Sequence, residues 1–153
     1  MHEAFFFGPA DQQIFANYHP PVRGVGQVLT VICPPLFSDY MRTHLALRDL
    51  AMALAERGQH VLRFDYRGTG DSFGELGEVT VSTWVEDVAL AVREGREISG
   101  SAEVRLLPSR RALAGEGDRG QQCVARVPEI ADVSARVRRV LVKTDSGDGA
   151  VDV

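Results

Sequence analysis

Apolar residues follow two spacings along this chain, one typical of β-strands and one typical of α-helices. Short apolar runs rich in β-branched and aromatic residues predict strands, and these runs cover residues 5–7, 13–18, 27–33, 60–64 and 103–107. Apolar residues three and four positions apart predict amphipathic helices, which cover residues 39–57 and 81–98. Thr83 and Glu86 have capping-box spacing at the start of the second helix, and Gly58 and Gly100 mark the helix ends.

The order of these elements predicts the fold class. The turn signal GPAD joins the first two strands into a hairpin, and after it strands alternate with helices. Such alternation indicates right-handed crossovers and a parallel sheet covered by helices, which is the α/β class. The run QVLTVIC is mostly apolar, as in a strand that is buried on both faces. Because chemistry in these sheets lies at the carboxyl ends of the strands, the candidate loops are CPPLFSDYMRT, DYRGTGDS and LLPSRR.

Composition narrows the range of functions. The 153 residues, 44% hydrophobic and 25% charged, suit one globular domain with a real core. The net charge of -4 argues against a nucleic-acid partner. The chain contains no apolar segment of bilayer length and no secretory leader, so we expect a cytoplasmic protein without a membrane partner. The four histidines lack metal-ligand spacing, and we expect neither a metal nor a cofactor.

The loop DYRGTGDS raises the question of nucleotide binding. A dinucleotide site needs G-x-G-x-x-G after the first strand of the unit. Here Gly68 and Gly70 are followed by Gly74, which is one position too late, and the loop follows the second parallel strand. The loop is also acidic where a phosphate would lie. A nucleotide-binding domain is therefore the weaker alternative.

The same loop carries a family resemblance. DYRGTGDS after an apolar strand, preceded by VICPPLFSDYMRTHLALRDLAMALAERG, resembles the amino-terminal half of the α/β hydrolases. It is most similar to the serine aminopeptidase or acyl-hydrolase-like branch, in which D-x-R-G-x-G-x-S follows the fourth strand. The resemblance covers residues 5–107. It implies a partial α/β-hydrolase sheet, and hydrolysis of a small-molecule ester, thioester or amide through a serine acyl-enzyme.

By that resemblance the loop is structural. We expect Arg67 and Asp71 to hold the turn through charge-assisted hydrogen bonds. Asp65 and Ser72 are expected to bond to nearby backbone, and the two glycines of RGTG to supply backbone angles that other residues resist. The loop then shapes the floor of an active site without performing the chemistry.

The loop after the third strand implies an oxyanion hole. The family commonly has a His-Gly pair there, and this chain has Pro34-Pro35 instead. The backbone N–H of Leu36 or Phe37 would then donate to the oxyanion. In the alternative interpretation the prolines only end the strand, and the two apolar residues line the core.

The nucleophile and its base are the weak points of the resemblance. The family presents G-x-S-x-G after the fifth strand, whereas this chain reads EVRLLPSRRALAG. Ser109 lies near the expected place and is the candidate nucleophile, although an ordinary exposed serine is the alternative. The sequence has no histidine after His60, so a Ser-His-acid relay cannot be assembled. We therefore expect a truncated and inactive chain.

Residues 108–153 differ from residues 1–107, which form the hydrolase-like half. All aromatic residues fall within residues 1–84, and the tail is rich in Arg, Gly, Ala, Val and Asp. Such a tail is expected to be disordered or irregular. One hypothesis is an out-of-frame translation. The alternative is a natural short form, a noncatalytic partner-binding fragment or pseudoenzyme, in which residues 124–142 form a weak amphipathic helix over the sheet. A five-strand fragment would also expose a sheet edge for self-association.

The coding sequence tests the frameshift hypothesis. If the tail is out of frame, another frame near codon 107 encodes a glycine-rich elbow, further strand–helix units and a histidine. If every frame lacks them, the hypothesis is wrong.

Overall fold

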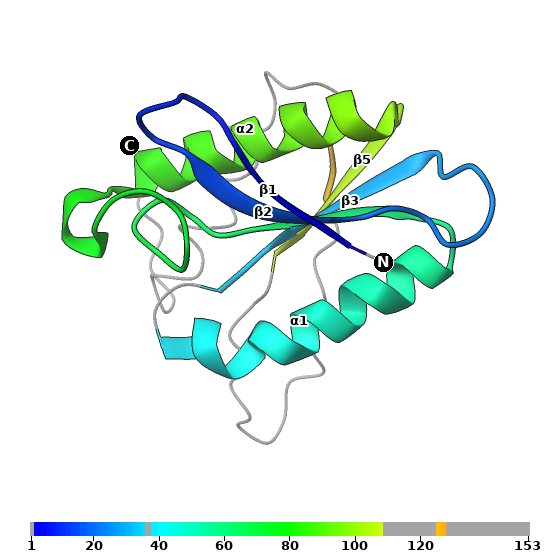
Figure 1. Ribbon diagram of the computed structural model, residues 1–153, viewed down its shortest axis with the longest axis horizontal. Coiled ribbons are helices and arrows are strands. Elements are labelled where there is room, and N and C mark those ends of the chain that lie inside the picture. Colours follow the sequence, from blue (N-terminus) through cyan, green and yellow to red (C-terminus); the bar gives the residue numbers. More distant parts are fainter. Residues whose placement is uncertain (1, 36–37, 109–124, 128–153) are drawn as a thin grey trace, which may run out of the picture.

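Two helices cover opposite faces of one mixed sheet in the computed structural model (Figure 1), which describes residues 2–35, 38–108 and 125–127. The strand order is β1-β2-β4-β3-β5-β6. The strands are β1 (Glu3–Phe7), β2 (Ile14–His19), β3 (Val28–Cys33), β4 (His60–Phe64), β5 (Glu103–Pro108) and β6 (Ala125–Val127). The helices are α1 (Ser38–Glu56), the short 3-10 helix η1 (Leu76–Glu78) and α2 (Val81–Ser99).

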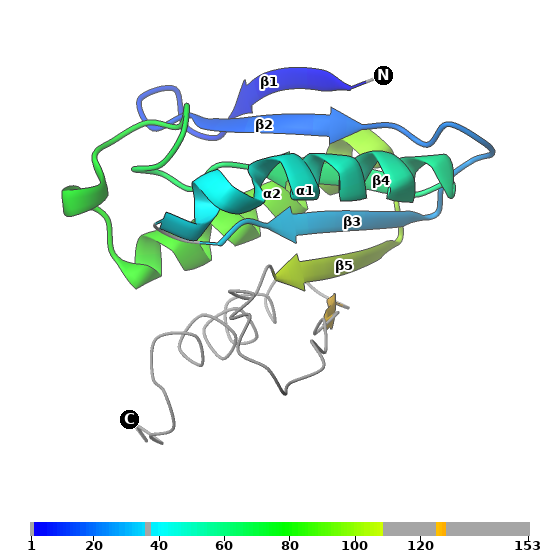
Figure 2. The ribbon, with the colours of Figure 1, turned by 90° about the horizontal axis from the view of Figure 1, so that it is seen from below.

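The centre of the sheet is parallel. β3 pairs in parallel with β4 on one side and with β5 on the other. The hairpin β1–β2 is antiparallel and joins the sheet through antiparallel pairing of β2 with β4. The predicted hairpin followed by parallel strands with crossover helices is confirmed. Because the chain moves from β3 to β4 and then back past β3 to β5, right-handed crossovers place α1 and α2 on opposite faces, as Figure 2 shows.

The larger core lies between the sheet and α2. Leu29 and Val31 of β3 and Leu62 of β4 are fully buried there. The apolar stripe of α2 packs against them, and its buried members are Trp84, Val85, Val88, Ala91 and Val92. Gly95 lets the helix approach the sheet closely, since a Cβ there would lie 2.7 Å from Leu29.

The core under α1 is smaller. Its buried residues are Ile32, Ala51, Val61 and Leu107. β3 therefore buries side chains on both faces, as its apolar run predicts. The face towards α1 also carries polar groups, among them a hydrogen bond of 2.7 Å from Thr30 to Gln59. The two faces of the sheet thus differ in chemistry as well as in area.

The ends of the helices follow local rules, with one correction. Gly58 and Gly100 have φ of 83° and 64°, in the left-handed region predicted for them. The predicted capping box at Thr83 and Glu86 is wrong by three residues, because Thr80 is the N-cap and its side chain accepts from the Thr83 N–H. Thr80 is extended and Val81 begins the helix, and in the reciprocal bond the Thr80 backbone N–H donates to the Thr83 hydroxyl. Among the described helices, none has the apolar length that a membrane span requires.

The carboxyl-terminal third corrects the sequence analysis at one place. Residues 125–127 lie within the predicted helix over 124–142 but form strand β6, antiparallel to β5. The predicted five-strand sheet therefore has a sixth strand, which covers part of the β5 edge. Residues 109–124 and 128–153, and with them the rest of the predicted irregular tail, lie outside the described residues.

His19 on β2 makes the fold sensitive to acid. Its side chain is buried, and burial, with the positive charges of Arg63 and His2, lowers its pKa to about 4. The unfolded chain takes up this proton near pH 6.5, so the free energy of unfolding should fall as the pH drops from about 6.5 to about 4.

Replacing the histidine tests this. Between about pH 7 and about pH 5, the free energy of unfolding measured with urea should fall less in His19→Phe than in the wild type. His44→Phe, at an exposed position, is the control. Equal pH dependence of His19→Phe and wild type would contradict the prediction.

Candidate functional site

The carboxyl ends of β3 and β5 lie next to each other. Cys33, the last residue of β3, pairs with Pro108, the last residue of β5. The chain therefore leaves both strands at one place, where the sequence analysis expects the oxyanion loop and the nucleophile. Leu36, Phe37 and Ser109 themselves lie outside the described residues.

The loop after β4 uses its own backbone donors. Hydrogen bonds within the protein engage seven backbone N–H groups of residues 65–73, those of Asp65, Arg67, Gly68, Thr69, Asp71, Ser72 and Phe73. A phosphate cradle needs backbone N–H groups that point at the ligand. This arrangement disfavours the nucleotide-binding alternative.

Ser72 ties the loop to two strands. Its hydroxyl donates to the carbonyl of Asp65 at 2.6 Å and accepts from the N–H of Phe15 at 2.9 Å. The N–H of Phe73 adds a bond of 2.9 Å to the carbonyl of Gln13. The loop is thus fastened to both the end of β4 and the start of β2.

Asp65 connects the loop to the start of α1. One carboxylate oxygen accepts from the Tyr40 hydroxyl at 2.7 Å, and the other accepts from the Asp71 N–H at 3.2 Å. Burial, followed by the bond to Asp65, raises the pKa of Tyr40, so its hydroxyl stays protonated and donates. Gly70 is required here, because a Cβ would lie 2.1 Å from Asp65 Oδ2 and its φ is 54°. The charge that holds this turn is therefore on Asp65, where the sequence analysis expected it on Asp71.

Arg67 fastens the loop to α2. Its Nε donates to Asp87 Oδ1 at 2.5 Å, and its backbone N–H donates to Asp87 Oδ2 at 2.9 Å. Further bonds reach Gln12 at 2.6 Å and Glu86 at 3.1 Å. Asp87 is completely buried; burial raises its pKa, and the bonds from Arg67 oppose that shift. The Arg67 side chain thus bonds to groups outside the loop, on α2 and at Gln12, whereas the sequence analysis expected it to hold the turn itself.

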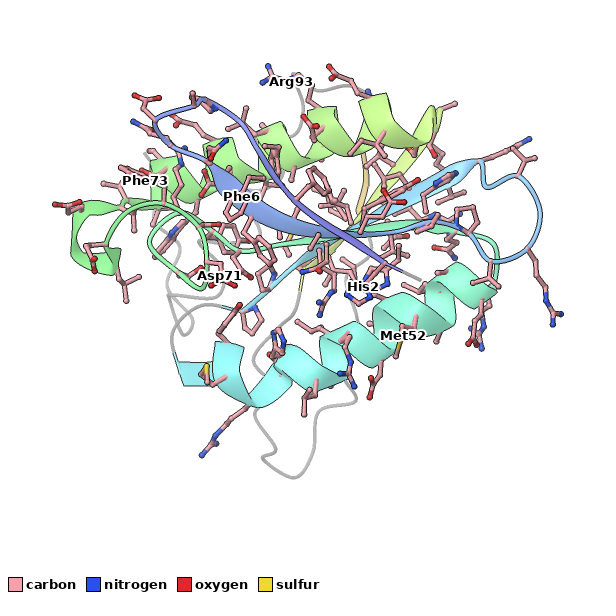
Figure 3. The ribbon with its side chains drawn as sticks, viewed as in Figure 1. His2, Phe6, Met52, Asp71, Phe73 and Arg93 are labelled. Carbon is pink, nitrogen blue, oxygen red and sulfur yellow. The ribbon has the colours of Figure 1, made fainter. Side chains whose placement is uncertain are left out.

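A small cleft lies beside this loop, between β4 and α1. Its volume is about 60 Å³, and its lining includes Tyr40, His44, Arg63, Asp65 and Asp71. Figure 3 shows Asp71 at this end of the sheet, while Phe73, further along the loop, projects outward. Phe73 is 56% exposed. The cleft is thus polar at its rim and close to the carboxyl end of β3 through Pro34.

The remaining candidates for chemistry are used structurally. His60 Nδ1 forms a hydrogen bond of 2.5 Å with the Tyr18 hydroxyl, and His60 Nε2 lies 3.2 Å from the carbonyl of Gly26. Burial raises the pKa of the Cys33 thiol to about 12, so it is not a nucleophile at neutral pH. No group of three potential metal ligands occurs among the described residues.

Sequence reasoning missed Asp87 and Tyr40. Asp87 lies three residues after Trp84, within the apolar stripe of α2. A carboxylate in such a stripe needs a cationic partner, and that signal could have linked it to Arg67. Nothing in the local pattern around Tyr40 indicates its bond to Asp65.

Solved structures of other proteins superimpose on this fold. A serine hydrolase homologue from Coxiella burnetii superimposes with a TM-score of 0.60 at 22% identity, over 89% of this chain and 56% of that one. A serine hydrolase without a lid from Xanthomonas campestris gives 0.59 at 20% identity, over 71% and 50%. The fold is that of the α/β hydrolases.

A third solved structure matches over the same share of this chain as the second one. Est1E from Butyrivibrio proteoclasticus, solved with ferulic acid bound, gives a TM-score of 0.56 at 16% identity, over 71% of this chain and 43% of that one. The chain spans about half the length of these solved structures. No protein-family model matches the sequence, and no curated protein matches it. The likeness therefore concerns the α/β-hydrolase fold, and the serine aminopeptidase branch stays a prediction.

The Arg67–Asp87 pair should be essential for stability. Removing one member of a buried ion pair costs about 3–5 kcal/mol, because the other charge stays buried without its partner. We expect Arg67→Met to lower the free energy of unfolding, measured with urea, by about that much. Adding Asp87→Asn to this variant should restore part of the lost free energy. The control is Arg105→Met, which removes a partly exposed pair with Glu103 and should cost less than about 1 kcal/mol. If both arginine variants lose equally little, the pair does not hold the loop.

Proposed function

We propose that this chain is the amino-terminal part of an α/β serine hydrolase that cleaves an ester, thioester or amide bond through an acyl-enzyme, and that the chain alone does not turn over substrate. The pairing of Cys33 with Pro108 supports the proposal most directly. It brings the loop after β3 and the segment after β5 out of the sheet side by side. A hydrolase needs its oxyanion donors and its nucleophile in that relation.

The proposed roles follow from this placement. The backbone N–H of Leu36 or Phe37 donates to the oxyanion as the tetrahedral intermediate forms. Ser109 is the proposed nucleophile. The residues of the β4 loop hold the scaffold through the Arg67–Asp87 and Asp65–Tyr40 bonds.

The missing part is the general base. A serine hydroxyl needs a base within hydrogen-bond reach to become a nucleophile, and the sequence has no histidine after His60. His60 itself is bonded to Tyr18 and close to Gly26. The chain as it stands therefore supplies scaffold and oxyanion donors without a complete relay.

A noncatalytic partner-binding protein is the second candidate. α1 exposes the apolar residues Met41, Leu45 and Met52, which are 79%, 60% and 42% exposed. Their spacing of four and then seven residues places them on one face of the helix. This stripe favours a protein partner. A cytoplasmic location and self-association through a sheet edge are further parts of the proposal.

A fluorophosphonate probe tests whether the chain is active. We expect no labelling of the purified protein, because Ser109 has no base to activate it. Mass spectrometry of the tryptic peptides measures labelling at that serine, with Ser109→Ala as the matched variant and an active serine esterase as the positive control. Labelling that disappears in Ser109→Ala would show a working nucleophile and would contradict the proposed inactivity.

A further inference from the structure

Arg63 places a positive charge in the cleft between β4 and α1. Its Nε is buried and has no hydrogen-bond partner within the described ranges. Among the described residues its guanidinium makes one hydrogen bond, from Nη1 to the carbonyl of His44, and this bond is long, at 3.5 Å. A guanidinium has five N–H donors, and a buried donor without a partner costs stability. Arg63 therefore has hydrogen-bonding capacity that the described protein leaves unused.

The neighbouring carboxylates do not use this capacity. Both oxygens of Asp65 already accept, one from Tyr40 and one from the Asp71 N–H. None of the ion pairs found among residues 2–35, 38–108 and 125–127 includes Arg63. The charge of Asp65 is close enough to influence Arg63, but no ion pair joins these two side chains within the described ranges. The described part of the cleft thus holds a cation without a direct anionic partner.

The sheet register places further polar groups around Arg63. Asn17 on β2 and Ile32 on β3 are its direct neighbours across the sheet. Both line the cleft, together with His44 from α1. The Asn17 amide and the His44 ring are donors that can approach the same ligand as the guanidinium.

The size and walls of the cleft define the ligand. A cavity needs about 10–15 Å³ of open space to hold one water molecule, so a cleft of about 60 Å³ has room for a carboxylate group. The apolar walls are Phe15, Ile32, Leu47 and Phe64. Asp65 and Asp71 at the rim repel an anion with two or more charges more strongly than one with a single charge. These features favour a monoanion with a short apolar chain over a phosphate.

We propose that this cleft binds the carboxylate group of a small aliphatic ligand, with Arg63 as its anchoring residue. The planar guanidinium can donate two parallel N–H bonds to the two carboxylate oxygens. The site goes beyond the proposed hydrolase function, because binding a carboxylate needs no nucleophile and no oxyanion hole. It can therefore be tested on the purified chain whether or not that chain turns over an ester.

Thermal unfolding with sodium butyrate tests the site at constant ionic strength, with sodium chloride as the balancing salt. A ligand that binds only the folded state raises Tm in a saturable way. We expect a rise of a few degrees in the wild type at butyrate concentrations well above a Kd of about 1–10 mM. Inorganic phosphate should give a smaller rise. Arg63→Gln should abolish the butyrate effect and Arg63→Lys should weaken it, because lysine keeps the charge without the planar fork.

Arg105→Gln is the matched control, since Arg105 is also a strand arginine but is paired with Glu103 away from the cleft lining. It should keep the full butyrate effect. A second measurement needs no variant: in a ¹H–¹⁵N spectrum of the wild type, butyrate should shift the Arg63 Nε–H signal and leave that of Arg105 in place. A wild type without saturable stabilisation and without that shift, or an Arg63→Gln variant that folds and keeps the effect, would overturn the proposal. Fluorophosphonate labelling of Ser109, which would contradict the proposed inactivity, would leave the carboxylate site untouched.

Discussion

β3 is hydrogen bonded on both sides by parallel strands, and the rest of the molecule follows from that constraint. Parallel neighbours cannot be joined by a tight turn, so each connection needs a crossover helix. The chain goes from β3 to one neighbour and then to the other, which places α1 and α2 on opposite faces and makes β3 apolar on both. It also makes the carboxyl ends of β3 and β5 meet, with Cys33 beside Pro108.

The loop after β4 links this sheet to both helices. Asp65 reaches the first turns of α1 through Tyr40, and Arg67 reaches the buried face of α2 through Asp87. The two charged side chains are two residues apart and serve opposite faces of the sheet. The glycines that follow them allow the backbone to turn without a side chain in the way, most clearly at Gly70. The loop therefore positions the helices while its own donors are used internally.

Local patterns predicted the elements well and their long-range partners poorly. β3, β4 and both long helices lie within one residue of the expected bounds, because apolar spacing is a property of each segment alone. The bond between Arg67 and Asp87 joins positions 20 residues apart, and only the sheet topology decides that they meet. The same holds for Arg63, whose place in a cleft depends on α1 crossing in front of β4. Strand β6 was missed because its three residues carry no periodicity that outweighs the helical spacing around them.

The unequal burial on the two faces of the sheet has a consequence for native-state dynamics. Two residues of α1, Ala51 and Ala55, are buried apolar residues, whereas α2 buries a continuous apolar stripe and an ion-paired carboxylate. The free energy needed to detach a helix scales with the apolar area it buries. α1 is therefore the element that separates from the sheet first, in excursions that leave the main core intact. Amide hydrogens along α1 are therefore expected to exchange with solvent faster than those of α2.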